Sequence, residues 1–203
     1  AEVEVLEILP AVETLQWLAR RGPEILAGES IGFSRSQHPF KRGRWAYEPL
    51  GVVAVLGPAA EPFATPLGDV AVALMAGNGV VLKPSPFAVL SAERIARIFA
   101  RAGLPEGLLR VVHGFADVGG WLVDASVAQV RFTGNASAGR AVAEACARAL
   151  KRSVLELGGN DPTLVLADAH LDKAVRGTAW AAFANAGQSS GSVARAICVH
   201  KVA

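Results

Sequence analysis

Two apolar runs of this sequence end on residues that could hold a phosphate group, and the first closes with Phe132, Thr133, Gly134 and Asn135. Gly139 follows inside a predicted helix. Glycines permit close backbone approach, and the N–H groups that open a helix attract anions, so this turn suits a pyrophosphate. The same glycines also serve an ordinary strand-to-helix turn, and their spacing is not that of the common dinucleotide fingerprint.

The second run ends on a lysine. Lys83 follows the apolar residues Val80–Leu82 and precedes Pro84 and Ser85. A point charge at a strand end could meet a ribose hydroxyl or a phosphate. The alternative is a strand-end lysine that is simply solvated.

Two further residues could take part in catalysis. Glu156 lies inside the apolar run that leads to Gly158 and Gly159. Burial there would raise the pKa of its carboxyl toward the range of a general base, whereas a strand-edge glutamate would face water. Ser190 ends a polar, glycine-containing loop. No pattern supplies a Ser, His and Asp triad, since none of the four histidines has a telling context and each is expected to be structural or exposed.

Composition narrows the class of protein. The chain has 203 residues, of which 52% are hydrophobic and 19% charged, enough to bury the core of one large or two small domains. The net charge of +2 does not indicate a nucleic-acid partner, and the basic cluster Lys41, Arg42 and Arg44 is interpreted as a solvated loop.

The two cysteines, Cys146 and Cys198, give neither a disulfide framework nor a metal-ligand spacing, so no metal site is predicted. Both are expected to be buried small hydrophobes, and a reducing cytoplasm is the inferred location. We identify no leader and no apolar stretch of membrane-spanning length, which predicts a protein that is neither exported nor embedded in a membrane.

The elements that must position these residues follow from the apolar pattern. Residues 1–28 predict short helices separated by breaks at Pro10 and Pro23, and residues 29–48 predict extended or loop structure. From residue 51 onward, short apolar runs alternate with helical periods, which predicts a parallel sheet covered by helices on both faces. The predicted strands are 52–56, 79–82, 109–112, 127–132, 154–157, 163–166 and 196–199, and the predicted helices are 66–76, 90–102, 117–123 and 136–150.

Five motifs between Pro49 and Val199 together resemble the aldehyde dehydrogenase superfamily. They are Pro49-Leu-Gly-Val-Val, Ala76-Gly-Asn-Gly-Val-Val-Leu-Lys-Pro-Ser85, Phe132-Thr-Gly, Leu155-Glu-Leu-Gly-Gly159 and Asn185-Ala-Gly-Gln188. The resemblance implies an enzyme with NAD or NADP as cofactor, in which a cysteine attacks an aldehyde, hydride passes to a nicotinamide and a glutamate activates water.

The resemblance also assigns site residues. Glu156 matches the general base, and Ser190 stands at the position of the nucleophilic cysteine. Lys83 matches the lysine that contacts the adenosine ribose. The positions that the resemblance implies for cofactor binding are Lys83, Ser85, Gly114, Gly119, Thr133, Gly134, Asn135, Leu157 and Gly158.

Several positions depart from the family pattern. A serine hydroxyl is a far poorer nucleophile than a thiolate at neutral pH. Ala59 and Ala60 stand where the family has a Trp-Asn pair whose Asn donates to the oxyanion, so a donor is lost. Pro86 replaces an often acidic ribose ligand, which leaves the choice between NAD and NADP open, and Asn160 stands where a lysine is usual.

The resemblance predicts three segments: residues 1–48 as an N-terminal helical and extended segment, 49–157 as a Rossmann-like NAD(P)-binding domain, and 158–203 as the start of an α/β catalytic domain. Since the family continues well beyond the Ser190 loop, we expect a truncated and impaired enzyme for aldehyde oxidation. The alternative is an inactive NAD(P)-binding remnant or subunit. A third possibility is slow ester hydrolysis by Ser190 with Glu156 as base. The full-length family implies a homo-oligomer.

Overall fold

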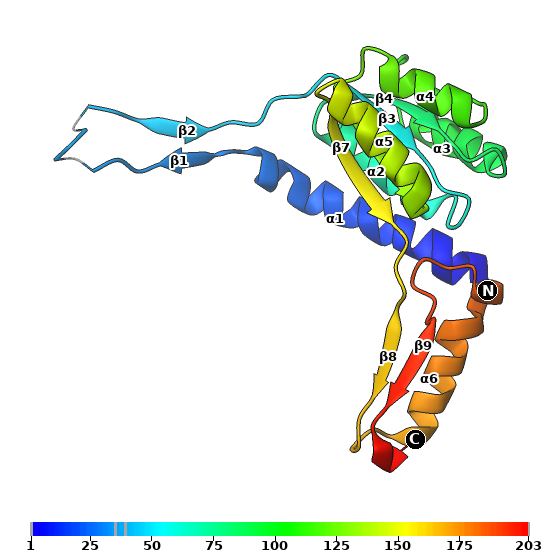
Figure 1. The fold of residues 1–203 in the computed structure, drawn as a ribbon. Helices are drawn as coiled ribbons and strands as arrows, with labels where there is room; N and C mark the ends of the chain where they lie inside the picture. Colours follow the sequence, from blue (N-terminus) through cyan, green and yellow to red (C-terminus); the bar gives the residue numbers. More distant parts are fainter. Residues whose placement is uncertain (1, 35, 39, 203) are drawn as a thin grey trace.

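A long amino-terminal helix opens the structure. The computed structural model describes residues 2–34, 36–38 and 40–202 (Figure 1), so residues 1, 35, 39 and 203 of the predicted segments lie outside the described residues. A π-helical turn, η1 (Glu4–Ile8), runs directly into α1 (Leu9–Leu26). The predicted breaks at Pro10 and Pro23 are therefore wrong. Pro10 lies directly after the π-helical turn and Pro23 lies in the last turn of α1, so the helix continues past each proline with one backbone N–H missing.

A hairpin follows α1. Strands β1 (Glu29–Ile31) and β2 (Gly43–Trp45) pair antiparallel, and Figure 1 shows them extending away from the large sheet. The described residues of 29–48 thus form two short strands and loop, in agreement with the prediction of extended or loop structure. Arg44 of the basic cluster donates from Nη2 to the carbonyl of Ala27 at 2.9 Å, which ties the hairpin to the end of α1.

The centre of the molecule is a five-stranded parallel sheet in the order β5-β4-β3-β6-β7. It confirms the predicted α/β class. Its strands are β3 (Val52–Leu56), β4 (Gly79–Lys83), β5 (Leu109–Val111), β6 (Gln129–Gly134) and β7 (Arg152–Leu157). The connecting helices are α2 (Ala64–Met75), α3 (Val89–Arg101), α4 (Ala116–Asp124) and α5 (Ala136–Arg148).

Both faces of this sheet carry a hydrophobic core, because the apolar residues of β3 alternate between them. Val53 and Val55 pack with residues of α1, α2 and α3, including Leu67 and Ile95. Ala54 and Leu56 pack on the other face with residues of α4 and α5. Burial of these side chains removes apolar surface from water on both sides of the sheet and fixes the direction in which the strands end.

One member of the second core is Cys146 of α5, which is fully buried as predicted. Burial raises the pKa of the Cys146 thiol, with Lys151 opposing, so this thiol is held in its neutral form. Cys146 is therefore a packing residue and not a nucleophile.

The carboxyl-terminal part forms a separate small sheet. Strands β8 (Pro162–Val165) and β9 (Arg195–Cys198) pair parallel, and α6 (Leu171–Phe183) and the short 3₁₀ turn η2 (Ala184–Gly187) connect them. The chain ends in a second 3₁₀ turn, η3 (His200–Val202). The prediction that Cys198 is buried is wrong, since all four residues of β9 are exposed on a sheet of only two strands.

Among the described residues, none of the helices combines the length and the apolar character that a membrane crossing requires.

Candidate active site

The predicted site residues gather where the parallel strands end. The strand order reverses between β3 and β6, since β4 lies on one side of β3 and β6 on the other. The register places Leu56, Lys83 and Phe132 side by side at these ends. Ligands of open parallel sheets bind outside the carboxyl ends of the strands at such a reversal, so this edge is the candidate ligand site.

Lys83 is a buried cation at this edge, with 7% of its surface exposed. Its Nζ donates to the carbonyl of Pro84 at 2.9 Å, the acceptor found for it among the described residues. Burial lowers the pKa of Lys83, and the negative charge of Asp117 opposes that shift. An ammonium carries three donors, so Lys83 keeps hydrogen-bonding capacity for an anion.

The two glycines implied for cofactor binding after β5 have different surroundings. A Cβ built on Gly119 would lie 3.9 Å from Cδ of Lys83, so these two residues are neighbours. Gly114 has a positive φ of 152°, and a Cβ there would overlap Val118 at 2.2 Å. Gly114 therefore shapes the turn, and Gly119 borders the lysine.

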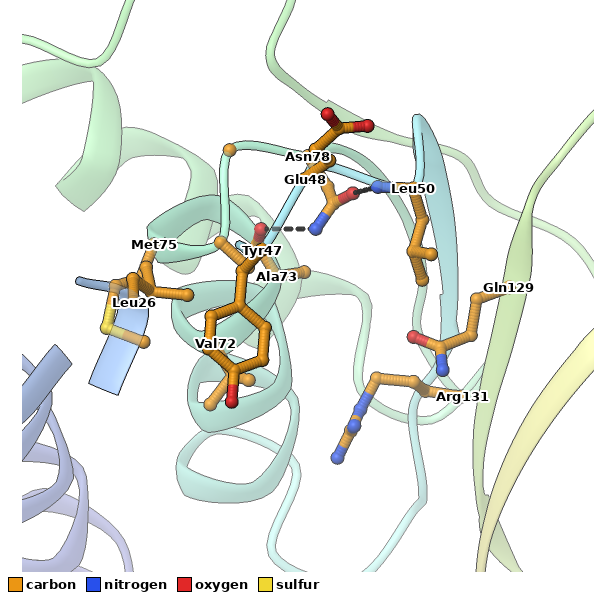
Figure 2. A pocket seen from close by; sticks show the side chains of 12 residues that line it. Leu26, Tyr47, Glu48, Leu50, Val72, Ala73, Met75, Asn78, Gln129 and Arg131 are labelled. Atoms are coloured by element: carbon orange, nitrogen blue, oxygen red, sulfur yellow. Dashed lines mark hydrogen bonds between the residues drawn. The ribbon is translucent and has the colours of Figure 1, made fainter. Parts of the chain in front are cut away.

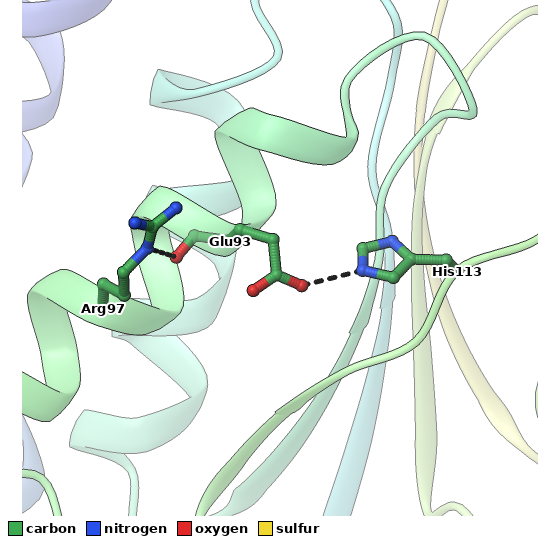
Figure 3. A network of polar contacts seen from close by, with 3 residues as sticks. All are labelled: Glu93, Arg97 and His113. Atoms are coloured by element: carbon green, nitrogen blue, oxygen red, sulfur yellow. Dashed lines mark hydrogen bonds and ion pairs between the residues drawn. The ribbon is translucent and has the colours of Figure 1, made fainter.

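Polar contacts hold the loops that follow β5 and β4 at this edge of the sheet. His113, which follows β5, and Glu93 of α3 form a hydrogen bond with Nε2 and Oε1 2.7 Å apart, and Figure 3 shows the contact bridging the helix and the loop. Arg97 donates from Nε to the carbonyl of Glu93 at 3.3 Å. On the β4 side, the hydroxyl of Ser85 accepts from the amide of Phe87 at 3.3 Å. These contacts fix the loops on either side of Lys83.

The turn between β6 and α5 leads into a capped helix start. Asn135 is the N-cap, and its Oδ1 accepts from the amide of Ala138 at 2.8 Å. The hydroxyl of Thr133 is buried, and no hydrogen-bond partner is found for it among the described residues. Buried polar atoms are normally paired, so this hydroxyl is available to a bound group.

Leu157, at the end of β7, lies against the same turn. A Cβ built on Gly139 would come within 2.4 Å of Leu157 Cδ2, so any other residue at 139 would displace this leucine from its present position. Gly158 follows with open space around it. The structure thus brings Gly134, Asn135 and Leu157 to one end of the sheet.

Of the two interpretations of Glu156, the structure agrees with the strand-edge glutamate that faces water and not with the buried carboxyl. Glu156 lies on β7, the edge strand of the sheet, opposite Thr133, and it is exposed. The negative charge of Glu156 acts on the carboxyl of Asp69 in α2. Burial raises the pKa of Asp69, Arg131 lowers it through an ion pair with Nη2 2.5 Å from Oδ1, and Glu156 raises it further.

The carboxylate that meets Ser190 is Glu61. The hydroxyl of Ser190 lies 3.0 Å from Oε1 and 2.9 Å from Oε2 of Glu61, and the Ser190 amide donates to Oε1 at 2.9 Å. The hydroxyl of Ser189 donates to the same oxygen at 2.6 Å. No hydrogen bond between Ser190 and Glu156 is found, so the pairing needed for ester hydrolysis with Glu156 as base is absent from the described residues.

Sequence reasoning missed Glu61. It lies in the loop after β3 and follows Ala59 and Ala60 in the sequence. A carboxylate in a loop at the carboxyl end of a strand was the signal that could have marked Glu61 as a site residue. Burial by itself would raise the pKa of Glu61, but hydrogen bonds from Ser189, Ser190 and Thr65 outweigh it and lower that pKa. Glu61 is held as a carboxylate.

A pocket of about 330 Å³ lies elsewhere, at the amino ends of the strands (Figure 2). Asn78 stands at its rim, where Oδ1 accepts from the amides of Leu50 and Gly51 at 2.6 and 3.1 Å. Tyr47 and Arg131 also line it. Because parallel sheets bind at the opposite edge, we do not assign this pocket to the candidate site.

A doubly wound parallel sheet with a buried lysine, a capped helix start and a polar loop at its carboxyl edge defines a nucleotide-binding class of α/β protein. Comparison with known proteins gives the family. The model of the aldehyde dehydrogenase family matches residues 1–203, and the chain belongs to this family.

Two relatives show how much of the family sequence this chain covers. The chain is 40% identical over 189 residues to a 4,4'-diapolycopene aldehyde oxidase from Methylomonas sp, covering 93% of this chain and 36% of that protein. It is 49% identical over 142 residues to a vanillin dehydrogenase from Amycolatopsis sp., covering 69% of this chain and 29% of that protein. The chain therefore spans well under half the length of these relatives.

The fold agrees with a solved structure of an aldehyde dehydrogenase from Bacillus cereus in complex with NAD+. The TM-score is 0.87 at 30% identity, and the match covers 96% of this chain and 39% of that one. An NAD-dependent aldehyde dehydrogenase from Sinorhizobium meliloti gives a TM-score of 0.85 at 33% identity, covering 94% and 38% of the two chains.

Proposed function

We propose that this chain supplies the NAD(P)-binding part of an enzyme that oxidises an aldehyde to a carboxylic acid. The observation that carries the proposal is Lys83, a buried cation at the point where the strand order reverses, with donors left for a ligand. A buried charge without a matching anion is unfavourable, and a nucleotide would supply the anion.

The residues at the sheet edge fit such a cofactor. Lys83 would bind a ribose hydroxyl or a phosphate, and Ser85 would lie in the same turn. Gly134, Asn135 and the start of α5 would face the pyrophosphate, where helix N–H groups favour negative charge. Thr133 would offer its buried hydroxyl, and the remaining proposed contacts are Gly114, Gly119, Leu157 and Gly158. When bound, the nicotinamide supplies the hydride acceptor. NAD and NADP are both compatible with this edge, because Pro86 presents no carboxylate that would repel a 2′-phosphate.

Ser190 and Glu156 are proposed for the chemical step by their positions in the family pattern. Glu156, exposed on the edge strand, would act on water as a base. Ser190 is the weak point of this assignment, because its hydroxyl is already bound to Glu61 and because Ala60 offers no side-chain donor to an oxyanion. These observations favour the second candidate function, a protein that binds NAD(P) and does not turn over aldehyde.

Further properties follow from the family as proposals. The relatives named as vanillin and benzaldehyde dehydrogenases suggest an aromatic aldehyde as substrate class. We also propose the division into segments 1–48, 49–157 and 158–203, a homo-oligomeric assembly for the full-length protein, and a reducing compartment such as the cytoplasm, in keeping with two unpaired cysteines.

Calorimetric titration of the chain with NAD and then with NADP tests the binding part of the proposal. Saturable binding of either cofactor supports it, and a folded chain that binds neither contradicts it. Cofactor reduction on addition of benzaldehyde tests the chemical step. We expect no turnover from the chain itself, and turnover would exclude the binding-only alternative.

A further inference from the structure

The loop around Ser190 presents a convergent set of hydrogen-bond donors to a single carboxylate. Two hydroxyls and one backbone amide, all from Ser189 and Ser190, lie 2.6 to 3.0 Å from the oxygens of Glu61. Thr65 adds a hydroxyl from the first turn of α2. A carboxylate only accepts hydrogen bonds, so the match between donors and ligand is complementary.

The donors keep their positions through contacts of the loop itself. The amide of Ser189 donates to Oγ of Ser192 at 3.3 Å, and the amide of Val193 donates to the carbonyl of Ala181 at 3.1 Å. At the loop entrance, Glu2 accepts from the amide of Asn185 at 3.0 Å. The Ser189 and Ser190 hydroxyls and the Ser190 amide are the loop donors that point at Glu61.

The backbone of Glu61 is strained where its side chain reaches this loop. Its φ is 49°, in the left-handed region that residues with a side chain seldom adopt, and Asn185 and Ala186 of the loop have φ values of 51° and 56°. Such conformations persist where surrounding contacts determine them, and they gather at ligand sites. No ion pair of Glu61 is found among the described residues, so hydrogen bonds from the loop are what compensate its charge.

We propose that the Ser189–Ser190 loop is a carboxylate-binding site that the chain fills with its own Glu61. The ligand class is a small monocarboxylate, and any carboxylate or carbonyl oxygen that approaches Ser190 must first displace Glu61. The proposal stands on this geometry and does not depend on cofactor binding or on aldehyde oxidation.

Replacement of the internal ligand by a free one tests the site. In Glu61→Ala, we expect the amide resonance of Ser190 to move away from its wild-type position and to return toward it, saturably, as sodium acetate is added. The wild-type chain and the Glu106→Ala variant, which removes an exposed carboxylate, should not respond to acetate at Ser190. A Ser190 resonance that ignores acetate in Glu61→Ala, or that responds equally in the wild type, would overturn the proposal.

A second pair of variants decides the question if Glu61→Ala does not fold. In a background with Cys198→Ser, which removes the exposed native thiol, Ser190→Cys places a thiol beside Glu61. A neighbouring carboxylate disfavours the thiolate, so iodoacetamide should alkylate Ser190→Cys about tenfold more slowly than the Glu61→Gln/Ser190→Cys pair, the effect of one unit in the thiol pKa. Equal rates would show that the carboxylate does not occupy the loop.

Discussion

Two regions of this molecule hold a carboxylate, and they do so by different means. At the large sheet, Asp69 is 13% exposed in its side chain and meets the guanidinium of Arg131, itself 20% exposed. At the Ser190 loop, the hydrogen-bond donors to Glu61 found among the described residues are hydroxyls and one amide, and Ser190 is exposed. In the sheet region, burial and an opposite charge hold the carboxylate of Asp69. In the loop, hydrogen bonds and left-handed backbone conformations hold the carboxylate of Glu61. Substitutions at the Asp69–Arg131 pair should therefore change the stability of the fold, and substitutions at the Ser190 loop should change the access of ligands to it.

The largest expected effect is on the Asp69–Arg131 pair. Arg131→Met leaves the partly buried Asp69 carboxylate near Glu156 without its cation, so the free energy of unfolding at neutral pH should fall by about 2 to 3 kcal/mol. Burial already raises the pKa of Asp69, and loss of Arg131 raises it further. The folded variant thus takes up a proton more readily than the unfolded chain, and the loss should shrink as pH falls through the folded-state pKa. Urea unfolding at neutral and mildly acidic pH measures this.

The control for that experiment is Arg110→Met. Arg110 and Glu106 form an exposed pair at 3.9 Å, with side chains 64% and 95% exposed. Exposed pairs contribute little, so the unfolding free energy should change by less than about 0.5 kcal/mol. A loss as large as that of Arg131→Met would show that burial does not distinguish the two pairs.

Lys83→Met should separate stability from binding. The buried ammonium, whose pKa is lowered by burial, is replaced by an apolar side chain of similar length, so the chain should gain about 1 kcal/mol of stability. Cofactor affinity should fall by about 10- to 100-fold, the usual weight of a hydrogen bond to a charged group. Urea unfolding and calorimetry give the two values. Unchanged affinity in a stabilised variant would remove Lys83 from the cofactor site.

Two glycine substitutions give the smallest expected effects. Gly177 of α6 has open space around it, so Gly177→Ala should stabilise the chain by up to about 1 kcal/mol. In Gly139→Ala the new methyl group meets Leu157, which is 39% exposed and can turn outward. We expect little change in unfolding free energy, within about 1 kcal/mol, but weaker cofactor binding because Leu157 is displaced. Equal affinity in both variants would exclude a role for Leu157.

The sequence predicted the sheet well because its central strands are buried. Val52–Leu56 and Gly79–Lys83 read as continuous apolar runs, and the helices between them carry a clear period. Prediction failed where tertiary contacts decide the outcome. The helix α1 continues through Pro23, and the apolar run at Cys198 is exposed because the two-stranded sheet has few partners.

In the candidate site, too, the sequence located residues at strand ends but not contacts between distant segments. Lys83 and Asn135 lie at strand ends that the pattern located, and the structure places them as expected. Glu61 was not found, because its role depends on a contact with Ser190, 129 residues further along the chain. For Glu156 the sequence left burial and exposure open, because local sequence does not encode that β7 is an edge strand of the sheet.

Amide hydrogen exchange of the chain with and without saturating NAD tests the central claim, that the carboxyl edge of the sheet is the cofactor site. The account predicts slower exchange at residues 134–139 and at Lys83 and Ser85 when NAD is present, with Ser190 and the pocket around Tyr47 and Asn78 unchanged. Slower exchange confined to that pocket, or no change anywhere in the folded chain, would contradict it.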